Sequence, residues 1–310
     1  MQYWDIVMRS FRISWNHKYL WLIALFSGEG GGGASFNFSQ PLSGRGSSPN
    51  VTAVRQQVLT WLGDHIALVT AVVILWLVLL IAFFILGAIC EGATVRAAAE
   101  HDAERPFGLR LAWRMGVHTM WVIVRFRLLL IALGLPLALL VIGLAAGIAV
   151  GVANGNTGAV VVLVLVGLLL LLIAIPYLIY LFFLDRLGTR AAVLEELAAR
   201  AAIVRAHRLL FKRLGRSLLV WLLSIGVSLV LGILLACVLG IVFIPFFLIG
   251  AALLATGSGA VWALVVIAVL LFLPVSLVIG GFLAAQGSTY WTLAFRRLDL
   301  DPAPSPQITS

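Results

Sequence analysis

The chain has 310 residues, of which 63% are hydrophobic and 11% are charged, and its formal net charge is +9. A soluble domain averages about 25% charged residues, so this composition excludes an ordinary soluble domain. Three segments, 66–90, 128–184 and 217–295, contain no Asp, Glu, Lys, Arg or His. Because a membrane span needs roughly 20 apolar residues, these segments predict a polytopic membrane protein.

Residues 13–26 form the first hydrophobic stretch, which is shorter than an ordinary span. It begins with polar residues and lacks a convincing small-residue cleavage site of the kind that ends a signal peptide. We interpret it as a retained first span whose Lys18 extends back to the lipid headgroups. The alternative is a helix that lies on the membrane surface or re-enters the membrane.

The segment 27–65 is rich in glycine and serine, and residues 30–33 are all glycine. Sequence of this composition forms a flexible coil when it is free. We expect an outer loop that serves either as a tether or as a segment that becomes ordered against a partner. Residues 66–90 then form the second span.

The two longer charge-free segments each predict two spans, because turn-forming residues interrupt both of them. The interruptions are Asn-Gly-Asn-Thr-Gly at 154–158 and Thr-Gly-Ser-Gly at 256–259. With the stretch at 13–26 and the span at 66–90, the total is about six spans.

The basic residues indicate the orientation of these spans. Of the 21 Lys and Arg residues, all except Arg45 and Arg55 lie outside the predicted outer loops. Lys and Arg are in excess on the cytoplasmic side of membrane proteins. Six spans with both termini in the cytoplasm place every basic-rich segment on that side. We therefore expect a multi-pass protein of the cell inner (plasma) membrane.

The chain reads as three similar hairpins, at 1–90, 91–184 and 185–297, followed by a tail at 298–310. Each hairpin opens with a basic amphipathic helix, and each returning span ends with a Gly that is followed closely by a Thr. This indicates either an internal duplication or the reuse of the same residue types at helix ends. Basic residues three or four positions apart share one helical face, which is typical of helices in the membrane interface. The residues predicted to contact lipid headgroups are Arg9, Arg12, Lys18, Arg110, Arg114, His118, Arg205, Arg208, Lys212 and Arg216.

The sequence offers little for catalysis or ion transport. Ionisable residues within a membrane mark proton and ion paths, and the charge-free segments contain none. We interpret the densest polar cluster, residues 100–105, as a solvated, self-paired charge run. Gly143, Gly147 and Gly151 have small-xxx-small spacing, which lets helices approach closely within the chain or at a partner interface. We predict no catalytic, cofactor-binding or metal-binding residue, no cofactor and no nucleic-acid partner.

The opening segment Phe11–Trp21, the glycine-rich stretch after Phe26 and the Gly-Thr span exits followed by basic helices together form a pattern. This pattern resembles a group of uncharacterised bacterial six-span membrane proteins. The group includes relatives of the membrane domain attached to some glycerophosphodiester phosphodiesterases. The resemblance covers the whole chain. The membrane part of this group has no established catalytic residues, so the resemblance implies none here. The phosphodiesterase domain itself is absent, so the resemblance does not imply hydrolase activity.

These observations predict an all-α fold, a polytopic transmembrane helical bundle of three hairpins with interfacial amphipathic helices. The expected function is that of a non-enzymatic subunit or scaffold. Its expected partners are other membrane proteins and anionic lipid headgroups on the inner face. The alternative is a transporter or binding protein for a lipid or other hydrophobic molecule, held in an apolar cavity between the hairpins.

Overall fold

The computed structural model describes residues 3–27, 59–255 and 260–300, and regular secondary structure in these residues is entirely helical. The helices in chain order are α1 (Tyr3–Asn16), α2 (Tyr19–Ser27), α4 (Ile66–Asp102), α5 (Leu109–Ala153), α6 (Thr157–Leu194), α7 (Ala199–Lys212), α8 (Leu214–Ala255) and α9 (Ala260–Leu300). Most of the predicted loop at 27–65 lies outside the described residues, as does most of the tail at 298–310.

Five helices, α4, α5, α6, α8 and α9, are long and apolar enough to cross a membrane. Three of them, α4, α5 and α6, have 37, 45 and 38 residues. At 1.5 Å per residue they are roughly 55–70 Å long, about twice the thickness of the hydrocarbon core. Each of these three therefore extends well beyond one membrane boundary. An all-α, multi-pass membrane protein is supported.

The first hydrophobic stretch does not form a long helix in the described residues. It is divided between the end of α1 and the nine residues of α2, with a break at His17 and Lys18. Nine helical residues extend about 14 Å, which is less than half of the hydrocarbon core. The sixth span, and with it the location of both termini on one side, stays a prediction.

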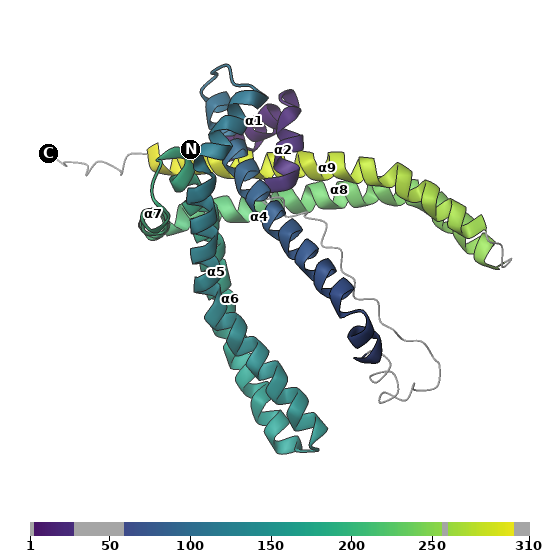
Figure 1. Ribbon diagram of the computed structural model, residues 1–310. Helices are drawn as coiled ribbons and strands as arrows, with labels where there is room; N and C mark the ends of the chain where they lie inside the picture. Colours follow the sequence, from purple (N-terminus) through teal and green to yellow (C-terminus); the bar gives the residue numbers. More distant parts are fainter. Residues whose placement is uncertain (1–2, 28–58, 256–259, 301–310) are drawn as a thin grey trace.

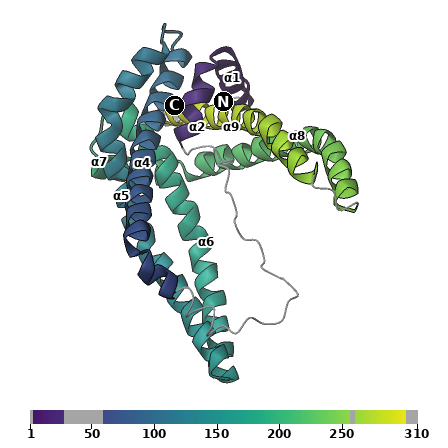
Figure 2. The ribbon, with the colours of Figure 1, turned by 45° about the vertical axis from the view of Figure 1, so that its right-hand side comes forward.

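The helices meet in a hub from which three arms diverge (Figures 1 and 2). The hub is defined as residues 3–27, 86–127, 183–220 and 281–300. The arms are the described parts of 66–85 (α4 alone), 128–182 (α5 with α6) and 221–280 (α8 with α9). Among the described residues, every buried residue except Gly151 and Ala174 lies in the hub. The folded core is thus at the polar ends of the long helices.

Small residues allow the helices to cross closely in this hub. A Cβ atom on Gly92 of α4 would collide with Thr119 of α5, and one on Gly116 would collide with the backbone of Ile89. These glycines bring α4 and α5 to backbone contact, as small residues do between membrane helices. Much of the remaining buried surface is alanine, for example at positions 93, 97, 191, 202 and 285.

The three returning helices α4, α6 and α9 contact one another at the centre of the hub. Helix α2 packs on α4 and α9, and α5 packs on α4 and α6. The amphipathic segments lie outside this layer: α1 packs on α9, the first turns of α5 pack on α4, and α7 packs on α6. Each basic segment therefore lies against the end of a different returning helix.

Two of the arms are helix pairs, α5 with α6 and α8 with α9. A Cβ atom on Gly147 would lie 3.3 Å from Leu163, and one on Gly151 would lie 2.9 Å from Val160, both on α6. The small-residue spacing in α5 therefore serves packing within the chain at these two positions. At Gly143 no neighbour lies within 4 Å.

Candidate membrane-interface site

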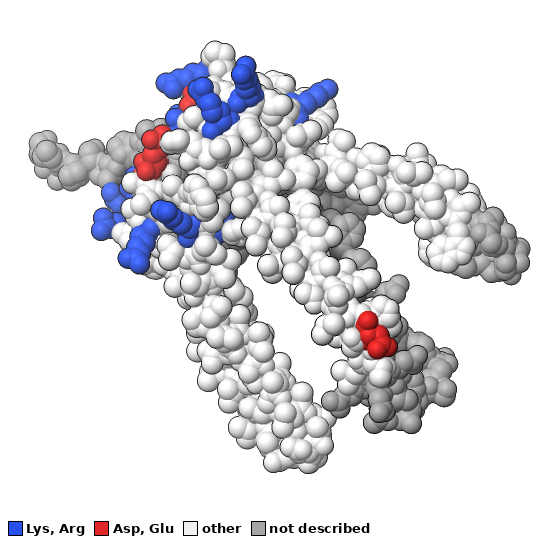
Figure 3. Space-filling view, viewed as in Figure 1, with Lys and Arg blue, Asp and Glu red and all other residues white. Residues whose placement is uncertain are grey.

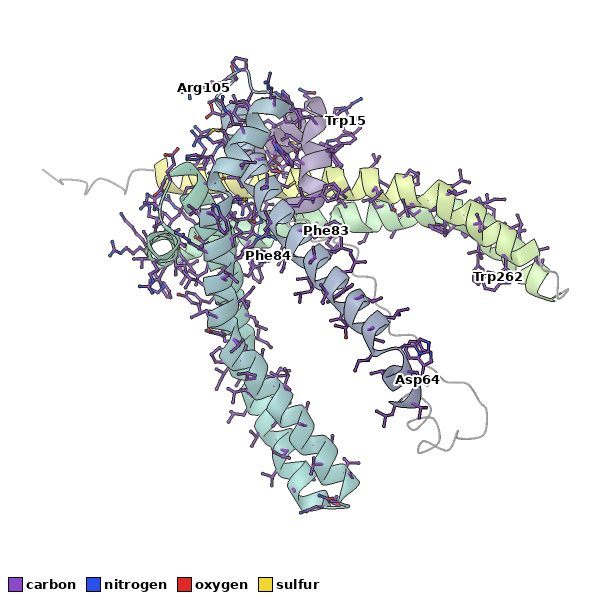
Figure 4. All side chains as sticks on the ribbon, in the orientation of Figure 1. Trp15, Asp64, Phe83, Phe84, Arg105 and Trp262 are labelled. Atoms are coloured by element: carbon purple, nitrogen blue, oxygen red, sulfur yellow. The ribbon has the colours of Figure 1, made fainter. Side chains whose placement is uncertain are left out.

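Helix α1 has two apolar faces with different environments. One face, which includes Ile6, Val7 and Ile13, is buried in the core of the hub. On another face, Trp4 and Trp15 are exposed. Figure 4 shows Trp15 projecting outward from the hub. Exposed tryptophans beside basic residues are typical of a helix that lies in the membrane interface.

The start of α5 carries the longest stripe of this kind. Leu109, Trp113, Val117 and Trp121 recur every four residues, so they share one helical face, and all four are exposed. Arg110, Arg114 and His118 each follow one of these positions by one residue and are also exposed. The stripe therefore combines an apolar band with a cationic edge. This combination suits the boundary between acyl chains and headgroups.

Helix α7 provides a third amphipathic surface. Val204 and Phe211, seven residues apart, are exposed on one face. A small cavity of about 210 Å³ lies beside this helix and is bounded mainly by cations. Its lining residues are Arg205, Arg208, Leu209, Lys212, Arg213 and Leu298. Four of its described lining residues are cationic and none of them is acidic, which suits an anionic headgroup.

The ten predicted headgroup residues fall into two groups. Arg9 and Arg205 are partly buried and hold acidic partners: Arg9 Nε lies 2.7 Å from Asp102, and Arg205 Nε lies 3.1 Å from Glu195. The other eight are exposed on the hub, namely Arg12, Lys18, Arg110, Arg114, His118, Arg208, Lys212 and Arg216. In Figure 3, the Lys and Arg side chains gather on the hub, and the visible described surface of the arms carries none.

The polar cluster at residues 100–105 is self-paired in part, because Arg105 Nη1 lies 3.4 Å from Glu100. The prediction that the cluster is solvated is wrong for Glu100 and Asp102. Asp102 is mostly buried and accepts hydrogen bonds from Arg296 Nη1 at 2.7 Å and pairs with Arg9. Glu100 is also mostly buried and pairs with Arg96 at 3.5 Å. The cluster joins α1, α4 and α9. Sequence reasoning missed this because the partners are about 93 and 194 positions away.

His101 forms a second link at the same end of α4. Its ring stacks on that of His17, with 3.6 Å between centroids, and its Nε2 lies 2.6 Å from the Tyr19 hydroxyl oxygen. The Tyr19 hydroxyl is also 3.3 Å from the carbonyl oxygen of Phe107. These contacts fix the break between α1 and α2 against the α4–α5 connection.

A buried ion pair lies on the membrane side of this junction. Glu91, 1% exposed, pairs with Arg127, and the same guanidinium donates to the carbonyl oxygen of Ser27 at 2.8 Å. These residues belong to α4, α5 and the end of α2. Glu91 and Arg127 are the residues that border the first two charge-free segments, so each segment ends where its helix enters the polar part of the hub.

An apolar cavity of about 520 Å³ lies between α2, α4 and the first turns of α5. We call it the α2–α4–α5 cavity. Its lining residues are Leu22, Ile23, Phe26, Leu86, Cys90, Leu109, Arg110 and Trp113. Of these, Arg110 alone carries a charge. Only Arg110 was among the predicted site residues, because the cavity depends on how α2 and α5 both pack on α4.

The sequence matches the model of a family of unknown function, DUF7544, over residues 8–293. The chain belongs to this family. The match includes the hub and all three arms, apart from the ends of α1 and α9. No curated protein and no solved structure is significantly similar to this DUF7544 protein. The relation to the phosphodiesterase-linked membrane domain therefore stays a prediction.

Proposed function

We propose that this protein is a non-enzymatic scaffold of the cell inner membrane. In this proposal, the hub lies on the cytoplasmic surface, and the arms contact other membrane proteins and lipids within the bilayer. The observation that carries the proposal is the contrast in burial between the two parts. Within the most apolar 18-residue window of each long helix, only 0–11% of the residues are buried, whereas the hub has a closed core.

This contrast bears on function because a self-contained bundle buries the facing sides of its spans. Here each arm is a single helix or a pair, and large apolar side chains point outward along its length (Figure 4). Lipid tails are as apolar as leucine, so lipid alone gives these helices little reason to associate. Arms that diverge from one hub can present their sides to several neighbouring proteins.

The charge distribution supports a cytoplasmic hub. All Lys and Arg residues except Arg45 and Arg55 belong to the hub, and positive charge favours the cytoplasmic side. Trp262, at the far end of one arm, and Trp61, just before the start of another, are exposed, as aromatic residues are at a second membrane boundary. We infer that both termini are cytoplasmic and that the first hairpin completes a sixth span.

An internal threefold duplication is part of the same proposal. The equivalent basic segments α1, the start of α5 and α7 pack on α9, α4 and α6 respectively. Thr94, Thr189 and Thr289, which follow the glycines at the three span exits, are all fully buried in the hub. The basic segment of each hairpin thus packs on the returning helix of the preceding hairpin, and that of the first packs on the last. Three copies of one duplicated hairpin would give this cyclic order.

A second candidate function is the binding of a lipid or other hydrophobic molecule. One observation favours it, namely the α2–α4–α5 cavity with its apolar walls. This candidate is compatible with a scaffold, because structural lipids often occupy the junctions between membrane helices.

Photo-crosslinking in the native membrane tests the scaffold. A photoreactive phenylalanine derivative is introduced singly at Leu168, Leu171 and Leu172, which are exposed on the α5–α6 arm. A protein partner gives a discrete adduct of higher mass from the positions on one helical face. The matched control is Leu187, which is fully buried in the hub and should give no intermolecular adduct. Scanning the other two arms at Trp76 and Leu234 completes the experiment.

One outcome of this experiment would contradict the scaffold. If no position on any arm gives a protein adduct while lipid adducts form throughout, the arms contact only lipid. Because the crosslink forms before detergent is added, a weak complex is still captured.

A further inference from the structure

We propose that the α2–α4–α5 cavity is a binding site for one anionic phospholipid of the leaflet beside the hub. One acyl chain would enter the cavity, and Arg110 would bind the phosphate. This proposal rests on the second candidate function and names its site and ligand class. It does not depend on the scaffold.

The walls of the cavity match an acyl chain. Its volume of about 520 Å³ lies within the range of roughly 300–1,000 Å³ that is typical of small-molecule sites. Seven of its eight lining residues carry no charge, and the deepest, Ile23 and Cys90, are 1% and 2% exposed. Water in such a space lacks the two to four polar partners that it needs, so an apolar occupant is favoured.

The position of the cavity indicates that its occupant comes from the membrane. Its rim includes Leu109 and Trp113, which begin the exposed apolar stripe of α5, and Leu22 and Phe26, which are exposed on α2. The opening is therefore continuous with the surface assigned to the membrane interface. A lipid can enter sideways without crossing water.

The positive charge at the rim of the cavity favours anionic lipids over zwitterionic ones. Arg110 lies on the rim and is exposed, and Arg114 lies one helical turn further along. None of the described residues that line the cavity is Asp or Glu, and the nearby Glu91 is paired with Arg127. A guanidinium binds a phosphate with two parallel hydrogen bonds, and one basic residue near a membrane favours anionic lipid by about fivefold. A zwitterionic lipid offers the same phosphate but adds a cation that Arg110 repels.

Native mass spectrometry of the full-length protein, released from detergent, tests the site. Phosphatidylglycerol and phosphatidylcholine with identical chains are titrated separately. The wild-type protein should retain one phosphatidylglycerol about fivefold more tightly than phosphatidylcholine. Leu22→Trp fills the mouth and should weaken this binding by at least about fivefold. Arg110→Gln should abolish the preference for phosphatidylglycerol.

Two matched variants control for surface effects. Leu219→Trp adds the same side chain at an exposed apolar position on α8. Arg125→Gln removes an exposed cation of α5 that does not line the cavity. Both should bind as the wild-type protein does. The proposal is overturned if Leu22→Trp binds normally, or if Arg125→Gln loses the preference as fully as Arg110→Gln.

Cys90 provides an independent measurement that does not depend on a destabilising variant. In a Cys237→Ser background, Cys90 is the remaining cysteine, and it lines the cavity. A bound acyl chain should slow its reaction with the small reagent methyl methanethiosulfonate by at least about fivefold in phosphatidylglycerol nanodiscs relative to phosphatidylcholine nanodiscs. Equal rates would overturn the proposal. Crosslinks from the arms should persist in Leu22→Trp, so failure of the lipid site and failure of the scaffold are distinguishable.

Discussion

Arg296 near the end of α9 donates a hydrogen bond of 2.7 Å to Asp102 at the end of α4, across 194 positions of sequence. The same carboxylate also pairs with Arg9 of α1 at 2.7 Å. The first and last helices of the described chain are therefore joined to α4 through one side chain. The hub is closed by this junction as well as by its apolar core.

Asp102→Asn should destabilise the hub. The substitution removes the charge that two cations share at a mostly buried position, so the free energy of unfolding should fall by about 1–2 kcal/mol. Denaturant titration in detergent micelles measures this. Glu104→Gln is the control, because Glu104 is 87% exposed and lies 3.9 Å from Arg9. An equal effect of the two variants would show that Asp102 has no special role.

The buried Glu91–Arg127 pair should be more sensitive than the Asp102 junction. Glu91→Gln leaves a partly buried guanidinium without its carboxylate, and we expect a loss of about 2–4 kcal/mol of stability. Glu91→Gln combined with Arg127→Gln should cost less than the sum of the single changes. A double-mutant cycle of unfolding free energies measures the coupling. Simple additivity would contradict a direct pair.

The glycines at the α4–α5 crossing provide a third prediction. Gly116→Ala should cost about 1–3 kcal/mol, because the new methyl group meets the backbone of Ile89, which cannot rotate away. Gly287→Ala on α9 is the control, since nothing lies within 4 Å of its added Cβ. There, alanine should be neutral or stabilising by up to about 1 kcal/mol through helix propensity. Thermal unfolding of both variants compares them, and similar losses would argue against close packing.

Much of this architecture could be predicted from the sequence. The charge-free segments correctly predicted the five long helices, one from 66–90 and two from each of the longer segments. This was possible because the lack of charge and the turn-forming residues at 154–158 are local properties of the sequence. The basic helical faces were likewise visible in the spacing of Arg110, Arg114 and His118.

Other features depend on tertiary contacts and had no local signal. Helical spacing alone does not show that Arg205 pairs with Glu195 whereas Arg208, on the same helical face, is exposed. The role of Asp102 required partners from both ends of the chain. The division of residues 13–26 between two short helices also reflects packing, because His17 stacks on His101 at the break.

The exposed cations of α7 should control contact with anionic lipid. Arg208 and Lys212 are exposed and line the small basic cavity, so neutralising both as Arg208→Gln with Lys212→Gln should remove about 2 kcal/mol of attraction. Enrichment of phosphatidylglycerol around the protein, measured by lipid analysis after extraction in nanodiscs, should fall accordingly. Arg205→Gln is the matched control. Because the Arg205 guanidinium donates hydrogen bonds to Glu195, this substitution should reduce stability but leave lipid enrichment nearly unchanged. If Arg205→Gln lowers lipid enrichment as much as the double substitution does, burial and ion pairing do not determine which cations bind the headgroups.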